Sequence, residues 1–319
     1  TLSGTVRDSG GGVLAGAKVT VTNIATNVAD RTTTSSNGAY LVVNLRSGQY
    51  VVEAEAPGLQ RAVQSVILEI GQRGRLDVTL GVGPLTETVT VEGAMRLLNT
   101  EDATLGTVFE NNAVANLPLA IRNWDDLLAL VPGVQGDRYT EQGGGTSFGR
   151  TGGVNVHGAR SMQNNFLLDG VDNNSISTNV QELSTQVSRP SIDAIGEFKV
   201  VTTPFTAEYG RAPGATISVT TKSGSNSLKG TTYYYFRDER FDANTFFANR
   251  SSLAKPTNNQ NQFGGSLGGP VRTGRAFFFA DYEGTRITRG VLRTGTVPAA
   301  AQRQGAFSSA IRDPLTGQP

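Results

Sequence analysis

Few residues in this sequence could carry out catalysis. His157 is the only histidine among 319 residues, and cysteine is absent. A zinc site of the H-E-x-x-H type needs two histidines, while thiolate nucleophiles and iron–sulfur clusters require cysteine. A Ser-His-Asp triad would have to use His157, which lies in a glycine-bounded segment without nearby ligand spacing. We therefore expect that this chain is not an enzyme.

The other chemically active residue types have simpler explanations. Asp125 and Asp126 are adjacent at the start of an expected helix, where acidic residues suit the positive end of the helix dipole. Ser252 and Lys255 have S-x-x-K spacing, but the partner motifs S-D-N and K-T-G are absent. One cluster of oxygen-bearing side chains could bind Ca²⁺, but it lacks EF-hand spacing and its residues are typical of turns. This cluster is Asp169, Asp172, Asn173 and Asn174. We expect no metal and no cofactor.

Charge and hydropathy limit the possible partners. The chain has 28 Lys and Arg against 27 Asp and Glu, so no net field attracts nucleic acid. No apolar run approaches the ~20 residues of a membrane-spanning helix. The first residues already alternate like a strand, so we expect any signal peptide to have been removed or to lie upstream. With 39 glycines and 37% hydrophobic residues, the composition favours several β-rich modules over one helical core.

Residues 1–82 consist of short alternating segments separated by turn signals such as Asn37-Gly38 and Pro57-Gly58. Seven such segments predict an antiparallel β-sandwich of immunoglobulin-like size. The expected strands are 2–7, 17–23, 29–34, 39–45, 49–56, 59–68 and 75–80. The expected core includes Val19, Val21, Tyr40, Val42, Tyr50 and Val52.

The same segment resembles a known family of accessory domains. The order of GTVRD, GAKVTVTN and SSNGAYLVVNLRSGQYVVEAEAPG is similar to the carboxypeptidase-regulatory-like domain, a seven-stranded sandwich. That family takes its name from a non-catalytic module. The resemblance therefore implies a spacer or docking domain and does not imply a peptidase.

A short alternating segment, Leu85–Glu92, follows Gly83-Pro84 and occupies residues 83–92 between two modules. It could be a linker strand. It also resembles the TonB box, a loose Thr- and Val-rich motif that an energy-coupling protein captures by strand addition. That resemblance implies contact with a TonB-type protein through Thr86, Glu87, Thr88, Val89, Thr90 and Val91.

The next expected element is a helix over residues 123–131. Asn123 could cap it, Pro132-Gly133 would end it, and a set of apolar residues at helical spacing would face the core. These residues are Trp124, Leu127, Leu128 and Val131. The following glycine-rich stretch, 136–153, has no phosphate-binding spacing and is expected to be a flexible loop.

Residues 154–224 carry the most specific resemblance. VNVHGARSMQNNFLLDGV, followed by IDAIGEFKVVTTPFTAEYGRAPGATISVTTKSG, is similar to the plug domain of TonB-dependent receptors. The residue patterns predict strands at 154–158, 165–169, 197–201 and 215–222, and the resemblance implies a mixed α+β plug over 93–225. Its motif residues are His157, Gly158, Asp169, Gly170, Tyr209, Gly210 and Lys222. Many relatives have Arg where this chain has His157, so the charged contact that this Arg makes with the barrel is in doubt here.

The aromatic and alternating segments after Gly224 predict strands at 231–236, 262–271 and 276–286. The first two are joined by a long polar connection, 238–262, and the last two by the short turn RTGR. Long loops alternating with short turns are typical of outer-membrane β-barrels, with the long loop outside and the short turn in the periplasm. A soluble sheet domain is the simpler alternative.

Together these features predict a mainly β chain: a seven-stranded sandwich, a mixed α+β plug, and the start of a transmembrane β-barrel at 226–319. Three strands cannot close a barrel, so we expect a truncated one. The domain order resembles Oar-like TonB-dependent receptors. It implies transport of an unknown extracellular substrate, driven by a TonB-type protein, across an outer membrane whose lipid surrounds the barrel. The sandwich would be periplasmic. The alternative is a surface adhesion or scaffolding protein of β-modules, which leaves the LLDGV and YG motifs unexplained.

Overall fold

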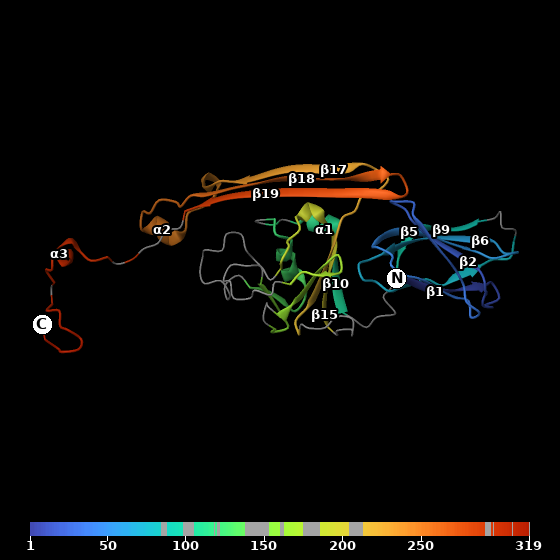
Figure 1. The fold of residues 1–319 in the computed structure, drawn as a ribbon, viewed down its shortest axis with the longest axis horizontal. Coiled ribbons are helices and arrows are strands. Elements are labelled where there is room, and N and C mark those ends of the chain that lie inside the picture. Colours follow the sequence, from blue (N-terminus) through green and yellow to red (C-terminus); the bar gives the residue numbers. More distant parts are fainter. Residues whose placement is uncertain are drawn as a thin grey trace. The chain divides into compact units, whose positions relative to one another are not determined.

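The computed structural model describes the chain except for residues 84–87, 98–104, 118, 120–121, 138–152, 160–162, 175–185, 204–212, 291–294, 296, 308 and 319. Figure 1 shows the strands coloured along the sequence. Contacts divide the chain into two units, one formed by 1–234 with 263–284 and the other by 235–262 with 285–319. None of the helices in the described part is long and apolar enough to cross a membrane.

The N-terminal domain is a sandwich of two sheets. One sheet has the order β4-β1-β7, with β8 also paired to β1, and the other has the order β3-β2-β5-β6-β9. The strands are β1 (Leu2–Asp8), β2 (Lys18–Asn23), β3 (Ala29–Thr33), β4 (Ala39–Val42), β5 (Gly48–Glu55), β6 (Arg61–Leu68), β7 (Gly74–Arg75), β8 (Val78–Leu80) and β9 (Thr88–Arg96). The expected sandwich and the positions of its strands are confirmed.

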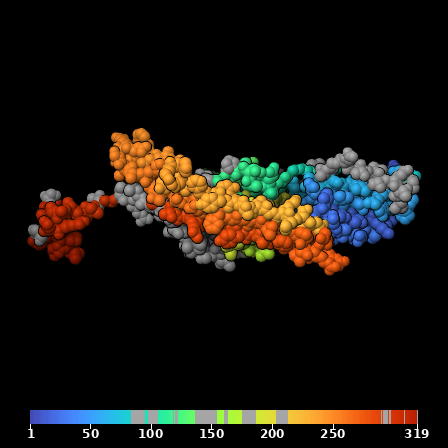
Figure 2. Space-filling view, turned by 90° about the horizontal axis from the view of Figure 1, so that it is seen from above, coloured from blue at the N-terminus to red at the C-terminus, as the bar shows by residue number. Residues whose placement is uncertain are grey.

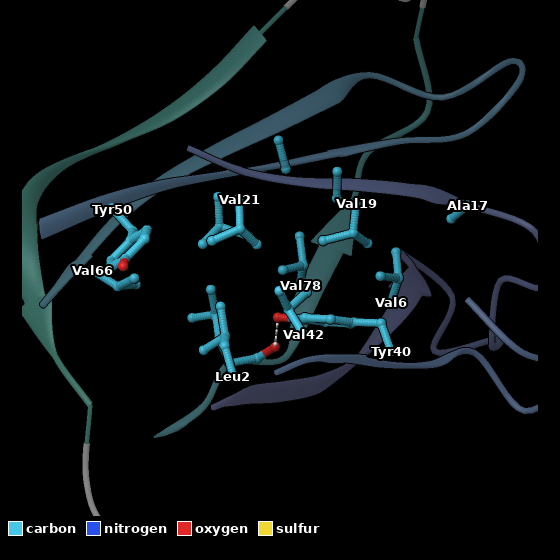
Figure 3. Close-up of a cluster of buried hydrophobic side chains, with 14 of the residues drawn as sticks. Leu2, Val6, Ala17, Val19, Val21, Tyr40, Val42, Tyr50, Val66 and Val78 are labelled. Carbon is cyan, nitrogen blue, oxygen red and sulfur yellow. Dashed lines mark hydrogen bonds between the residues drawn. The ribbon is translucent and has the colours of Figure 1, made fainter. Parts of the chain in front are cut away.

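Alternation of apolar residues explains the core of the sandwich. Val19 and Val21 of β2 are fully buried, and Figure 3 shows them facing side chains of the other sheet. All six core residues expected from the sequence are buried. The hydroxyl of Tyr40 is also buried and donates to the backbone oxygen of Leu76 at 2.7 Å. Gly4 lies against the same oxygen, which an added Cβ would approach to 1.8 Å, so this close packing of backbones requires glycine.

The expectation of a wholly antiparallel sandwich is wrong at its last strand. Residues 75–80 are divided into β7 and β8, and both pair with β1 in parallel. Asp77, between the two, accepts from the backbone N–H and the hydroxyl of Thr5 at 2.8 and 2.9 Å. A side chain therefore takes the place of a backbone acceptor at this point, and the strand is interrupted.

The middle domain contains a five-stranded sheet of order β10-β15-β16-β13-β14 and a separate β11-β12 pair. Its elements are β10 (Leu105–Glu110), α1 (Asn111–Asn116), η1 (Trp124–Leu130), β11 (Val134–Asp137), β12 (Gly153–Val156), β13 (Asn165–Leu168), β14 (Val171–Asp172), η3 (Ile192–Ala194), β15 (Ile195–Thr203) and β16 (Thr216–Thr221). The four strands expected here from the sequence are confirmed. Trp124, Phe166 and Phe198 are the largest fully buried side chains of its core.

The helix expected after Asn123 differs in detail. Residues 124–130 form a 3₁₀ helix, and the Asn123 side chain makes no cap hydrogen bond. Its oxygen instead accepts from Arg189, whose guanidinium also pairs with the buried carboxylate of Asp125 at 2.8 Å. Arg189, 66 residues along the chain, thus binds the side chain that was expected to cap the helix, while the two aspartates stay in the first turn as expected.

The C-terminal part has a three-stranded sheet of order β17-β18-β19. Its strands are β17 (Lys229–Arg237), β18 (Asn258–Arg272) and β19 (Ala276–Arg289), and the short helices are η4 (Glu239–Phe241), α2 (Phe246–Arg250) and α3 (Ala300–Arg303). All three expected strands are confirmed, and each is longer than its pattern indicates. The sheet presents a continuous surface in Figure 2, coloured yellow to orange-red. Its exposed apolar side chains include Tyr234, Val271 and Tyr282.

Candidate functional site

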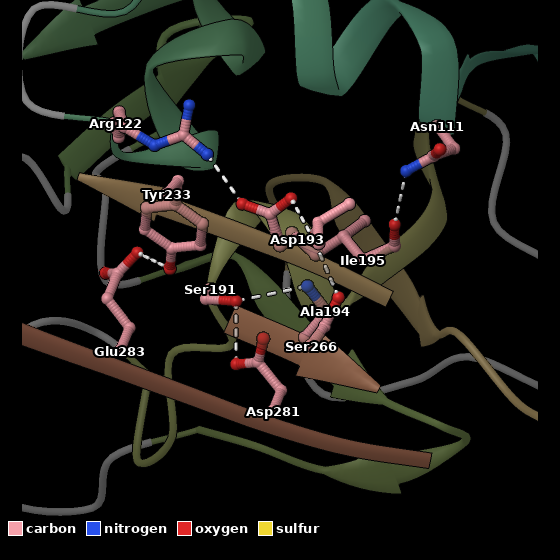
Figure 4. A network of polar contacts seen from close by, with 11 residues as sticks. Asn111, Arg122, Ser191, Asp193, Ala194, Ile195, Tyr233, Ser266, Asp281 and Glu283 are labelled. Atoms are coloured by element: carbon pink, nitrogen blue, oxygen red, sulfur yellow. Dashed lines mark hydrogen bonds and ion pairs between the residues drawn. The ribbon is translucent and has the colours of Figure 1, made fainter. Parts of the chain in front are cut away.

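A polar cluster joins the middle domain to the C-terminal sheet, and Figure 4 shows its side chains directed toward one another. At its centre the guanidinium of Arg122 donates to the carboxylate of Asp193 at 2.7 Å. The two side chains are only 14% and 16% exposed. Partial burial makes this pair stronger than a surface ion pair, because water screens it less.

Local structure places Asp193 for this contact. It is the second residue of η3, whose N-terminus is capped by the Ser191 hydroxyl accepting from the N–H of Ala194 at 3.1 Å. The Ser191 hydroxyl also donates to the carboxylate of Asp281 on β19 at 2.8 Å. One serine therefore both fixes η3 and bonds to the C-terminal sheet.

Strands β17 and β19 provide the facing side chains. The guanidinium of Arg122 lies 5.0 Å from the centre of the Tyr233 ring, a cation–π distance. The Tyr233 hydroxyl donates to the carboxylate of Glu283 at 2.7 Å. Thr231 on β17 donates a longer hydrogen bond, 3.4 Å, to Asp193. The middle domain and the C-terminal sheet are thus joined by polar contacts, each of which water can replace.

Lys222 lies where the chain leaves β16 for the C-terminal sheet. Its backbone N–H donates to the carbonyl of Ala194 at 2.7 Å, which ties this exit to η3. Burial lowers the pKa of its ammonium group, and the carboxylates of Asp193 and Asp281 oppose that shift. The expected motif residue Lys222 therefore interacts electrostatically with two carboxylates of the cluster, and its backbone is bonded to η3.

The other expected motif residues within the described part have structural roles. Asp169 accepts from both the N–H and the hydroxyl of Thr221, at 2.9 and 2.8 Å, and Gly170 continues the turn with φ of 83°. The backbone N–H of His157 donates to the Gly133 carbonyl at 3.0 Å, and the His157 ring lies against Gly133. Gly158 follows with φ of 81°.

The oxygen-bearing cluster after Asp169 is also accounted for by turn contacts. Asp172 accepts from the backbone and side chain of Asn174 at 2.9 and 2.8 Å. Asn173 is buried and exchanges two hydrogen bonds with the backbone of Ser188. In the described part of the chain, no group of three or more acidic or histidine side chains is arranged to hold a metal ion.

Replacing Asp169 with alanine is expected to lower the free energy of unfolding by about 1–3 kcal/mol, because two hydrogen bonds to a charged acceptor are lost. Asp169 also has φ of 50°, a conformation that asparagine tolerates better than alanine. Asp169→Asn should therefore lose less stability. Urea unfolding of both variants measures the two losses of stability. Equal losses would contradict the stabilising role of the Asp169 hydrogen bonds.

Several expected residues cannot be placed. Tyr209, Gly210, Thr86 and Glu87 lie outside the described residues. Thr88–Val91 form the start of β9, which pairs in parallel with β6 of the sandwich. The interpretation of this segment as an isolated linker strand therefore differs from the structure.

Sequence reasoning missed most of the polar cluster. Arg122, Ser191 and Asp193 lie in segments without a recognisable motif, and their partners are 71 and 90 residues away. The sequence also contains a G-x-S-x-G string at residues 145–149. It lies outside the described residues.

Three family models match the same three parts of the chain. A model of the carboxypeptidase regulatory-like domain matches residues 1–81, one of the TonB-dependent receptor plug domain matches 107–216, and one of an outer membrane β-barrel domain matches 220–319. The chain belongs to the TonB-dependent receptor family. The middle domain is its plug, and β17–β19 are part of its barrel.

The TonB-dependent transporter Oar of Myxococcus xanthus is 26% identical over 301 residues. The match covers 88% of this receptor chain and 26% of Oar, so the chain spans about a quarter of that relative's length. Among solved structures, the outer membrane transporter YddB of Escherichia coli has a TM-score of 0.39 at 17% identity, covering 58% of this chain and 30% of YddB. The siderophore receptor PirA of Acinetobacter baumannii has a TM-score of 0.40 at 19% identity, with 58% and 24% coverage. The assignment rests on the family models.

Proposed function

We propose that this chain is part of an outer-membrane receptor that binds an extracellular substrate and imports it when a TonB-type protein rearranges the plug. The observation that carries the proposal is the polar cluster between plug and barrel strands. Ser191, Arg122 and Asp193 on the plug contact Asp281, Tyr233 and Thr231, respectively, on the strands. A catalytic role has no support among these contacts, which hold two parts together.

The chemistry of the cluster suits a joint that must open and reclose. An apolar interface between plug and barrel would expose a large hydrophobic area to water on opening, at ~25 cal/mol per Å². Hydroxyl hydrogen bonds and a cation–π contact exchange with water at lower net cost. The aliphatic and aromatic core of the plug remains inside the plug, around Trp124 and Phe198.

Orientation and surroundings follow from the same proposal. The long connection between β17 and β18 faces outward, the short turn between β18 and β19 faces the periplasm, and the sandwich is periplasmic. Exposed apolar side chains such as Tyr234, Val271 and Tyr282 suit contact with outer-membrane lipid. The extracellular substrate is recognised by loops of the whole receptor.

Replacing residues 86–91 with a Gly/Ser segment of equal length is expected to abolish energised uptake and to leave the receptor in the membrane. The replacement keeps the chain length but removes the strand-forming sequence that a TonB-type protein would capture. Profiling the medium with and without the intact receptor identifies the depleted substrate, and the variant is then tested for its depletion and surface binding. Immunodetection controls for receptor level. Unchanged depletion would refute energy coupling through this segment.

A further inference from the structure

Strand β9 lies at the edge of the sandwich sheet. It follows β6 in the order β3-β2-β5-β6-β9, and Figure 1 labels both strands in that domain. Residues 88–91 pair in parallel with residues 61–64, and a register shift follows between Gln64 and Val66. One side of β9 is therefore bonded to β6, while no strand in the described part of the chain pairs with its other side.

The end of β9 is fixed in the sandwich. Leu97, the residue after the strand, is buried in the sandwich core. Its carbonyl accepts from the buried side chain of Gln72 at 2.7 Å. Gly74 makes room for the Leu97 side chain, since an added Cβ would lie 2.6 Å from it. These contacts hold β9 in place against the domain and set its register.

The start of β9, residues 88–91, lacks the charged residues that usually protect an edge strand, and the register shift lies after it. Natural edges carry lysine, proline, inward charges or bulges that prevent pairing with another chain. Residues 88–91 are Thr-Val-Thr-Val, all strongly β-forming and uncharged. An unprotected edge of this composition is a hazard unless a partner strand uses it.

We propose that the sandwich presents β9 as a pre-ordered template, and that a strand of the TonB-type protein pairs with its open side while β9 stays bonded to β6. This inference rests on the proposed function and specifies how the partner is captured. An unstructured segment would lose ~1–2 kcal/mol of backbone entropy per residue on capture. That cost is already met when β9 is part of the sandwich sheet, so preorganisation favours binding.

A disulfide tests whether β9 stays on β6. The chain has no native cysteine, so Val63→Cys with Thr90→Cys introduces a single possible bridge at two positions that are in register. Val63→Cys with Val91→Cys is the matched control, one position out of register, because successive residues of a strand point to opposite faces. The in-register bridge is expected to form on oxidation of the whole receptor in membranes, and the control bridge is not.

Binding of the purified periplasmic domain of the TonB-type protein to the bridged receptor then tests the open edge. We expect the same affinity with the bridge closed and reduced. Failure of the in-register bridge, or loss of binding when it closes, would overturn the proposal, since the second result would show that β9 must leave β6. If the unmodified receptor does not bind this domain while the bridge forms, the proposed energy coupling fails and the capture proposal with it, although β9 is then shown to be docked.

A proline scan gives an independent readout. Residues of a parallel edge strand alternate between bonding their neighbour and facing the open side, so proline at 88, 89, 90 and 91 should act alternately. Two positions should lower the melting temperature of the sandwich. The other two should leave it unchanged and weaken binding about tenfold by removing an N–H donor. Binding losses that only accompany lost stability would contradict pairing at the open side.

Discussion

Trp124→Ala is expected to lower the free energy of unfolding of the plug by about 3–5 kcal/mol, because a large buried side chain leaves a cavity that the core fills only in part. Trp124 is fully buried, and its ring lies 5.2 Å from that of Phe198, which in turn stacks on Phe109 at 4.7 Å. The loss therefore affects both η1 and strand β15. Hydrogen exchange of β15 amides in the whole receptor measures it.

Trp124→Phe is the matched control. The indole N–H of Trp124 has no hydrogen-bond partner among the described residues, so phenylalanine sacrifices volume without breaking a polar contact. We expect it to retain most of the protection that alanine loses. Equal effects of the two variants would show that the indole N–H matters more than the filling of the core.

Arg122→Ala is expected to loosen the joint between plug and barrel and to make the outer membrane leaky to a large antibiotic that it normally excludes. The substitution removes the contact with Tyr233 on β17, and it also breaks the 2.7 Å pair within the plug that holds Asp193 in place. It also leaves the carboxylate of Asp193 largely buried without its cation, which is costly. Antibiotic sensitivity of cells that express the whole receptor is the measurement.

Two further variants make this prediction specific. A double-mutant cycle of Arg122→Ala with Asp193→Ala should give a coupling free energy of about 0.5–3 kcal/mol in the stability of the plug, since the residues are in direct contact. Arg240→Ala removes a similar pair with Asp238, but the Arg240 side chain is 83% exposed, so no leak is expected. Unchanged sensitivity of Arg122→Ala cells with normal receptor levels would contradict the role of the cluster in holding the plug.

The strands could be predicted from the sequence because they depend on local alternation. Val19 and Val21 illustrate this, since each lies where period-two burial places it. The 3₁₀ form of η1 could not be predicted, because the pairing of Asp125 with Arg189 is set by tertiary structure. Parallel pairing of β7 and β8 with β1 depends on Asp77 bonding Thr5 across 72 residues, and no local pattern records that.

The candidate site was predictable only where a motif marks it. Asp169 and Lys222 belong to recognisable plug motifs, and their contacts with Thr221 and Ala194 are local to the sheet. Arg122 and Asp281 carry no such mark, because an ion pair or hydrogen bond between distant segments requires only a suitable polar or charged residue at each end. Such partners become visible once the strands that carry them are placed.

The central claim is that the plug moves while the barrel strands stay in place. Single-molecule pulling on the whole receptor in a lipid bilayer, through a handle attached at Asn99, tests it directly. We expect the plug to extend first, and Ser191→Cys with Asp281→Cys, bridged where the two side chains now bond at 2.8 Å, to stop that extension at residue 191 until the bridge is reduced. Extension that passes residue 191 with the bridge closed, or barrel strands that give way before the plug, would contradict the account.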